Sequence, residues 1–139
     1  MSSSCSLPNP ITGEIQQRKQ RWIAQNIVDY RYILENSCFC IPEVTQPVKI
    51  EVRDGKRVAI AAVKDGRSVN EEYFTHYDTI PKLFDLIQTE QDKKPSKIFV
   101  SYDLKLGFPV SIFVDRSENI ADEEIRLDVY GFEVIKSPN

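Results

Sequence analysis

The sequence predicts an α+β fold in which a curved, mainly antiparallel sheet of six strands carries two helices on one face. Two segments repeat apolar residues at helical spacing, six short segments alternate apolar and polar residues, and the order is helix, three strands, helix, three strands. A chain of 139 residues is long enough for one such core. We expect a flexible polar tail over residues 1–11 and a single α+β domain over residues 12–136.

The first helix is predicted from about Gly13 to Asn26. Thr12 is an acceptable cap, and Ile15 and Trp22 recur at helical spacing among charged residues. The next segment changes to a period of two, which is typical of a strand with one wet face. Its even-numbered residues are expected to face inward: Val28, Tyr30, Tyr32 and Leu34.

Two further strands flank Asp54-Gly55 and form the clearest hairpin of the sequence. A two-residue loop at Asp54-Gly55 would place Val52 opposite Arg57 and mix apolar with charged side chains on one face. A three-residue loop instead pairs Ile50 with Val58. The apolar pattern favours this second register.

Residues 64–78 show neither period, so we expect a long loop, with or without a turn of helix. Thr79 then caps a second helix with Pro81 in its first turn. The apolar residues of this helix lie at i, i+3, i+4 and i+7: Ile80, Leu83, Phe84 and Ile87.

Three more strands follow the second helix. Apolar residues alternate from Ile98 to Tyr102, from Val110 to Val114 and from residue 125 onward. In the last strand the parity switches near residues 130–131, which predicts a bulge. Phe99, Phe113 and Ile33 have the polar parity, so we expect them on the open face of the sheet, as a partner surface or as partial packing.

Composition excludes several classes of function. The net charge of -3 argues against a general nucleic-acid binder, and the longest apolar run, residues 58–63, is too short to cross a bilayer. The first ten residues contain no signal-peptide core, so the chain as written is expected in the cytoplasm. The five glycines are scattered singly and form no phosphate-binding loop, so we predict no cofactor.

Cys38 and Cys40, with His76, form a candidate thiol site. Three interpretations stay open: two buried thiols that pack as apolar residues, a redox or disulfide pair, and a metal site. Because one histidine leaves a zinc site short of ligands, we predict no metal. In a continuous strand the two Cβ atoms would lie about 7 Å apart, so a mutual disulfide requires the strand to end first.

A candidate binding surface combines exposed-parity aromatics, loop tyrosines and acidic residues at strand ends. Its members are Tyr73, Tyr77, Phe99, Phe113, Asp103 and Asp115. The two aspartates, with residues 122–124, could bind a hard cation, but turn hydrogen bonds are the favoured interpretation. Nucleophilic catalysis is hard to build from a single histidine, so an enzyme is not favoured.

Several short motifs of this sequence occur together in one bacterial family. In the first half they are Trp22, Tyr30, Tyr32, Ser37-Cys38-Phe39-Cys40, Pro47-Val48 and Val52-x-Asp54-Gly55. In the second half they are the helix from Thr79 to Ile87, Tyr102-Asp103, Gly107-Phe108-Pro109, Asp115 and Ala121-Asp122-Glu123-Glu124. Over residues 20–132 the chain therefore resembles the family catalogued as domain of unknown function 6174. The resemblance implies no activity, cofactor or partner, and it implies that many relatives are lipoproteins or secreted proteins.

These observations predict a non-catalytic binding or interaction module. It would offer either the open sheet face or the loop over residues 64–78 to an unknown protein or small-molecule partner. The alternative is a thiol redox or metal-handling protein that uses the Cys-x-Cys pair. Nucleic acid and membrane insertion are not expected.

Overall fold

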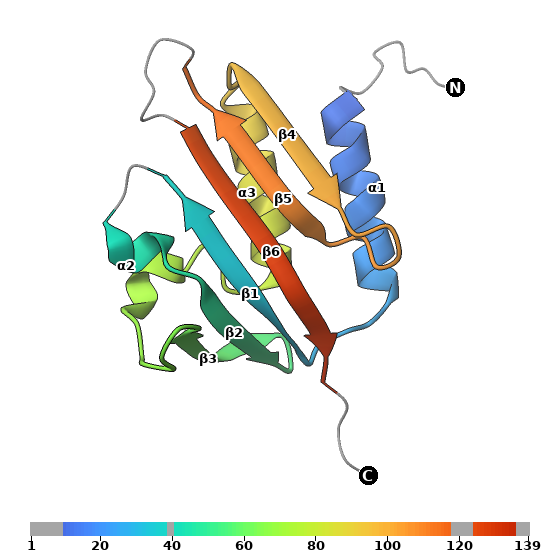
Figure 1. Ribbon diagram of the computed structural model, residues 1–139. Coiled ribbons are helices and arrows are strands. Elements are labelled where there is room, and N and C mark those ends of the chain that lie inside the picture. Colours follow the sequence, from blue (N-terminus) through green and yellow to red (C-terminus); the bar gives the residue numbers. More distant parts are fainter. Residues whose placement is uncertain (1–9, 39–40, 118–123, 136–139) are drawn as a thin grey trace.

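The computed structural model describes residues 10–38, 41–117 and 124–135. It contains one six-stranded sheet in the order β3-β2-β1-β6-β5-β4, in which every neighbouring pair is antiparallel. The strands are β1 (Tyr30–Ser37), β2 (Val48–Arg53), β3 (Lys56–Ala62), β4 (Lys97–Tyr102), β5 (Pro109–Asp115) and β6 (Glu124–Val134). Helices α1 (Pro10–Ala24) and α3 (Ile80–Asp92) lie on the same side of the sheet, behind it in Figure 1. The predicted fold class is confirmed.

Two short elements join the larger ones. A single helical turn, α2 (Pro42–Thr45), follows β1 and was not predicted. The long loop carries the 3-10 helix η1 (Glu71–Phe74), capped by Asn70, whose side chain accepts a hydrogen bond from the Glu72 amide at 3.1 Å. A turn of helix is thus confirmed within residues 64–78.

The first helix begins and ends earlier than its pattern predicts. It runs from Pro10 to Ala24 rather than from Gly13 to Asn26. Asn26 has a φ of 52°, a left-handed conformation that ends a helix. The second helix begins as predicted, because the Thr79 hydroxyl accepts a hydrogen bond from the Lys82 amide at 3.3 Å.

The core lies between the helices and the covered face of the sheet. The even-numbered residues of β1 are buried and the odd-numbered ones are not, as predicted. The prediction is wrong for Val28, which lies before the strand and is exposed. Trp22 of α1 packs its ring edge against Tyr30 at 5.4 Å and against Phe132 at 5.8 Å. This aromatic cluster fixes α1 on the sheet and contributes about 1 kcal/mol per ring pair beyond the area that it buries.

The predicted register of the β2–β3 hairpin is wrong. Asp54 and Gly55 have φ angles of 52° and 77°, which is a two-residue turn with both central residues left-handed. Val52 therefore lies opposite Arg57, and a register shift between Glu51 and Val52 then brings Ile50 opposite Ile60. The bulge returns the apolar residues of β3 to the core after a single mismatched pair.

The predicted bulge in β6 is confirmed. The pairing of β1 with β6 shifts between Arg31, which pairs with Glu133, and Ile33, which pairs with Tyr130, so Gly131 and Phe132 lie opposite Tyr32 alone. Gly131 adopts a φ of 64°, which a residue without a Cβ atom adopts at little cost. As a result Val129 before the bulge and Phe132 after it both pack against the core.

Candidate functional site

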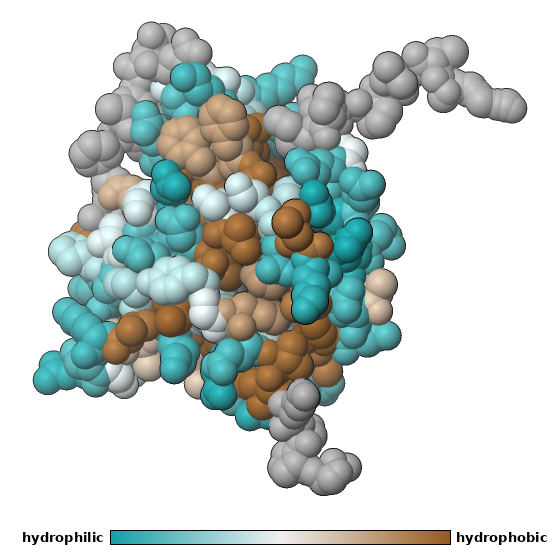
Figure 2. Space-filling model, turned by 45° about the vertical axis from the view of Figure 1, so that its right-hand side comes forward, coloured by the Kyte–Doolittle hydropathy of each residue, from teal (hydrophilic) through white to brown (hydrophobic). Residues whose placement is uncertain are grey.

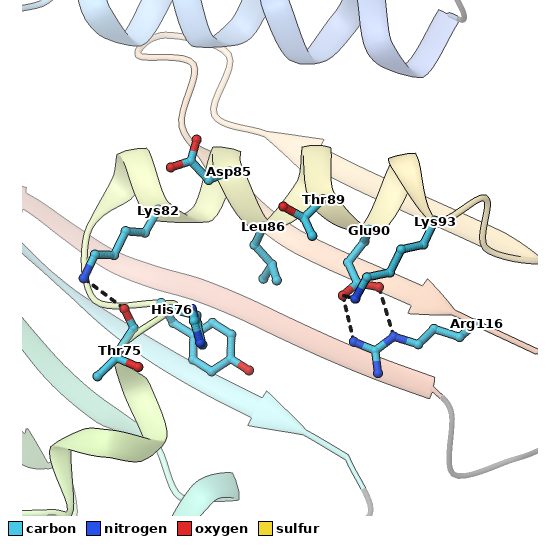
Figure 3. A pocket seen from close by; sticks show the side chains of 10 residues that line it. Thr75, His76, Lys82, Asp85, Leu86, Thr89, Glu90, Lys93 and Arg116 are labelled. Carbon is cyan, nitrogen blue, oxygen red and sulfur yellow. Dashed lines mark hydrogen bonds and ion pairs between the residues drawn. The ribbon is translucent and has the colours of Figure 1, made fainter.

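A groove of about 620 Å³ lies between α3, the segment after η1 and the residue that follows β5. Figure 3 shows the side chains that line it: Thr75, His76, Tyr77, Lys82, Asp85, Leu86, Thr89, Glu90, Lys93 and Arg116. Nine of these ten residues are on α3, directly after it or on the segment before it, and Arg116 directly follows β5. The groove has a charged end at either side and an apolar middle.

One end is built around Glu90. Its side chain is 3% exposed, and its two carboxylate oxygens accept hydrogen bonds from Arg116, from Nε at 3.0 Å and from Nη2 at 2.7 Å. The Lys93 ammonium lies 3.7 Å from the same carboxylate. The hydrogen bonds from Arg116 lower the pKa of Glu90 against the opposing effect of burial. Arg116 and Lys93 thus both contact the buried Glu90 carboxylate at this end.

The other end is built around Asp78, a buried carboxylate directly before α3. Its Oδ2 accepts a hydrogen bond from Arg57 Nε at 2.9 Å, and its Oδ1 lies 2.8 Å from Lys82 Nζ. Arg57 also pairs with Glu71 at 3.0 Å, so two anions balance two cations here. The hydrogen bond to Asp78 raises the pKa of Arg57. Lys82 also donates to the Thr75 carbonyl at 2.9 Å and ties the segment after η1 to α3 (Figure 3).

The middle of the groove is formed by Leu86 and the ring of Tyr77. In Figure 3 the Leu86 side chain points from α3 into the groove, whereas Asp85 points away from it. The backbone of Tyr77 is held in place because the hydroxyl of Tyr32 donates a hydrogen bond to the Tyr77 carbonyl oxygen at 2.6 Å. Burial raises the pKa of the Tyr77 phenol, so the hydroxyl stays a neutral donor at physiological pH.

The groove combines apolar and charged side chains in its lining. An apolar strip beside the Lys93 ammonium suits a small molecule with an apolar body and an anionic group. Its ten lining residues include no serine or cysteine, and the one histidine, His76, packs its ring against Tyr77 at 6.4 Å.

A second candidate surface lies on the open face of the sheet. Phe99 of β4 is 64% exposed, and its ring stacks on that of Phe113 of β5 at 6.2 Å. Both rings border a shallow hollow together with Ser101, Ser111 and Arg126. Figure 2 shows apolar side chains as a broken band down the middle of the molecule, with hydrophilic side chains on both sides. Phe113 and Ile33 are half-buried, so the residues predicted for this face are not all covered within the chain.

The six residues of the predicted binding surface fall in four separate places, since Asp103 and Asp115 lie at opposite ends of the β4–β5 hairpin. Phe99 and Phe113 lie on the open face, while Tyr73 and Tyr77 lie in or after η1. The two aspartates make turn hydrogen bonds, as the favoured interpretation predicts. Asp103 Oδ2 accepts from the amides of Lys105 and Leu106 at 3.1 and 2.8 Å, and Asp115 Oδ1 accepts from Ser117 at 3.2 Å.

The candidate thiol site is described in part. β1 ends at Ser37, so Cys38 lies past the strand, where a disulfide is geometrically possible. Cys38 is disulfide-bonded, and its partner sulfur lies outside the described residues, as does Cys40. His76 lies in the groove. A functional role for the three residues stays a prediction.

Sequence reasoning missed most of the groove. Glu90, Arg116 and Lys93 look like solvated charges when the sequence is scanned by residue type. One signal was available: Glu90 lies three residues after Ile87 and seven after Leu83, on the apolar side of the predicted helix. A charge at such a position needs a buried partner, and that partner is Arg116, 26 residues further along the chain.

The described part of the chain contains neither a metal-binding cluster nor a membrane-spanning helix. No group of three or more His, Cys, Asp or Glu side chains within residues 10–38, 41–117 and 124–135 is placed to hold a metal ion. No helix in these ranges is long and apolar enough to cross a bilayer.

Fold and groove together define a small α+β domain with an open antiparallel sheet and a site of ligand size. The model of the family of unknown function DUF6174 matches residues 14–134, so the chain belongs to this family. The family resemblance expected from the sequence is confirmed. No curated protein and no solved structure gives a significant match to the chain.

Proposed function

We propose that this domain is a non-catalytic binding module that takes a small amphipathic carboxylate in the groove beside α3. The observation that carries the proposal is the Lys93 ammonium, which is 58% exposed at the Glu90 end of the groove and remains accessible to a ligand. A carboxylate beside Lys93 would place its apolar body over Leu86 and the Tyr77 ring.

The proposal is tested by amide chemical-shift changes of the full chain. The probes are short alkyl and aryl carboxylates, each compared with its uncharged amide. We expect shifts at Leu86, Thr89 and Lys93 with the carboxylates and weak or no shifts with the amides. Shifts confined to other parts of the molecule, or equal shifts with both series, would contradict the proposal.

A matched pair of lysines at the end of α3 sharpens the test. Lys93 lines the groove, whereas its neighbour Lys94 is exposed and does not. Because an exposed charge pair contributes at most about 1 kcal/mol, Lys93→Gln is expected to weaken carboxylate binding about two- to fivefold. Lys94→Gln is expected to leave it unchanged, and equal effects of the two substitutions would show that only overall charge matters.

The thiol alternative is favoured by one observation, the disulfide at Cys38. A disulfide fits an oxidising compartment better than the cytoplasm expected from the sequence. Intact mass and thiol labelling of protein purified without reductant, before and after mild reduction, test this alternative. A bond that reforms on reoxidation and exchanges readily with glutathione supports a redox role, whereas a bond that resists glutathione indicates a structural one.

A further inference from the structure

The two edge strands of the sheet, β3 and β4, differ in how far the rest of the chain covers their outer edges. The outer edge of β3 is partly covered, because Ala61 forms a bridge with Ser68 and the Ala62 amide donates to the Arg67 carbonyl at 2.9 Å. The outer edge of β4 pairs with no strand in the described part of the chain. Its backbone N–H and C=O groups are therefore open to an added strand.

Edge strand β4 also carries Phe99, which is 64% exposed on the open face of the sheet. Phe99 is in the middle of β4, and Phe113 beside it extends the apolar surface inward across the sheet. Edge strands that must stay single are commonly protected by a charge or a proline in their middle, and β4 has neither at Phe99-Val100-Ser101. A strand with free backbone groups and an exposed aromatic side chain favours strand addition.

The charges at the two ends of β4 are self-complementary. Lys97 begins the strand and Asp103 follows it, and both share the parity of Phe99. If two copies of β4 pair antiparallel with Val100 opposite Val100, Lys97 lies opposite Asp103 of the partner subunit, and the reverse pair forms as well. None of the ion pairs within the described residues includes Lys97, and only Oδ2 of Asp103 accepts hydrogen bonds from its own turn there. This register therefore gains two ion pairs at once.

We propose that the chain forms a two-fold dimer through β4, with the two sheets joined into one. The two Phe99–Phe113 ring pairs then meet diagonally across the junction on the open face. Such a contact is isologous and stops at two copies, because it joins the β4 edge to itself and leaves only the covered β3 edges. A junction of two six-residue strands is small, so we expect a dimer that dissociates on dilution through the range of about 1 to 1,000 µM.

Sedimentation equilibrium of the full chain tests the dimer, with matched variants on the two edges. Lys97→Glu and Phe99→Ser are expected to weaken dimerisation by about tenfold or more, because they place like charges opposite each other or remove the central ring. The controls are Lys56→Glu and Val58→Ser on β3, which make the same kinds of change at exposed sites of the other edge. They are expected to leave the dimer unchanged.

A mixing experiment tests the register itself. The Lys97→Glu chain and the Asp103→Lys chain each carry two like-charge contacts in their own dimers. When the two are mixed, both contacts become attractive, so we expect a heterodimer at concentrations where each variant alone is monomeric. Thermal melts confirm that both variants are folded. A wild-type chain that stays monomeric at about 1 mM, assembly beyond the dimer, or failure of the mixture to associate would overturn the proposal.

Discussion

Glu90 is a charged residue at a position where helices normally place an apolar one. Removing a carboxylate from water costs several kcal/mol unless a partner compensates for it. The bidentate contact with Arg116 supplies that compensation and lowers the pKa of Glu90 below its ordinary value of 4.5. The pair therefore joins the last turn of α3 to the end of β5. It also places two charged side chains in the groove.

We predict that Glu90→Gln lowers the free energy of unfolding by about 2 kcal/mol at pH 7, since a charged hydrogen-bonded pair is lost from a buried site. Because the pKa of Glu90 is lower in the folded than in the unfolded chain, its contribution is present above the unfolded pKa. That contribution is lost as the pH falls through the lowered folded pKa. Urea unfolding at several pH values between 7 and 3 measures the difference.

The variant and the wild type are thus expected to converge in stability at low pH. Glu72→Gln, at an exposed carboxylate of η1, serves as the control and should change stability little at any pH. A difference for Glu90→Gln that is as large at pH 3 as at pH 7 would show that packing, and not charge, holds this residue.

At the scale of elements, α1 packs directly against the turn between β4 and β5. Gly107 has a φ of 91°, and a Cβ atom built on it would lie 2.6 Å from the Arg18 carbonyl oxygen. No side chain fits there without moving the helix backbone, so glycine is required by both conformation and space. The close approach of turn and helix also brings the Arg18 guanidinium over the Tyr102 ring, at 5.6 Å from its centroid.

We predict that Gly107→Ala destabilises the chain by about 1 to 3 kcal/mol more than Gly66→Ala. Gly66 has a similar left-handed φ of 72° but open space around its position, so it isolates the conformational cost from the clash. Denaturant melts of the two variants measure both effects. Equal losses would show that α1 shifts without cost and that only backbone conformation matters at Gly107.

Elements were predictable from the sequence where their signal is local. Thr79, Pro81 and the apolar residues that follow define α3 within one short window, and the change of parity near Gly131 reveals the bulge. The β2–β3 register was not predictable in this way. An apolar pattern disfavours Arg57 opposite Val52, but Asp78, 21 residues away, neutralises Arg57 and makes this register acceptable.

At the scale of the whole molecule, the first and last strands form the middle of the sheet. β1 and β6 each have two neighbouring strands, whereas β3 and β4 have one. Local periodicity indicates which segments are strands and thus the fold class. It does not indicate that Tyr30 pairs with Val134, because that choice depends on the packing of the complete sheet. The groove is equally non-local, since α3, the segment after η1 and the residue after β5 all contribute to it.

We predict that amides of β1 and β6 exchange with solvent at least about 100-fold more slowly than the outward amides of β4 in dilute protein. The reason is that central strands open only when the whole sheet opens. Hydrogen exchange followed by NMR measures this. If the amides of β3 or β4 were protected from exchange as strongly as those of β1 and β6 in dilute protein, the sheet would unfold from its centre.

The pairing of β1 with β6 has a consequence during synthesis on the ribosome. Leu34 and its neighbours on β1 emerge early, yet the strand that completes their pairing is translated only after some ninety further residues, since Leu34 pairs with Val129. Until then one edge of β1, beside an apolar face, has no strand to pair with, and exposed features of this kind are what chaperones bind. A premature stop codon before β6 would therefore leave an incomplete polypeptide that aggregates or is degraded, and not a shorter working domain.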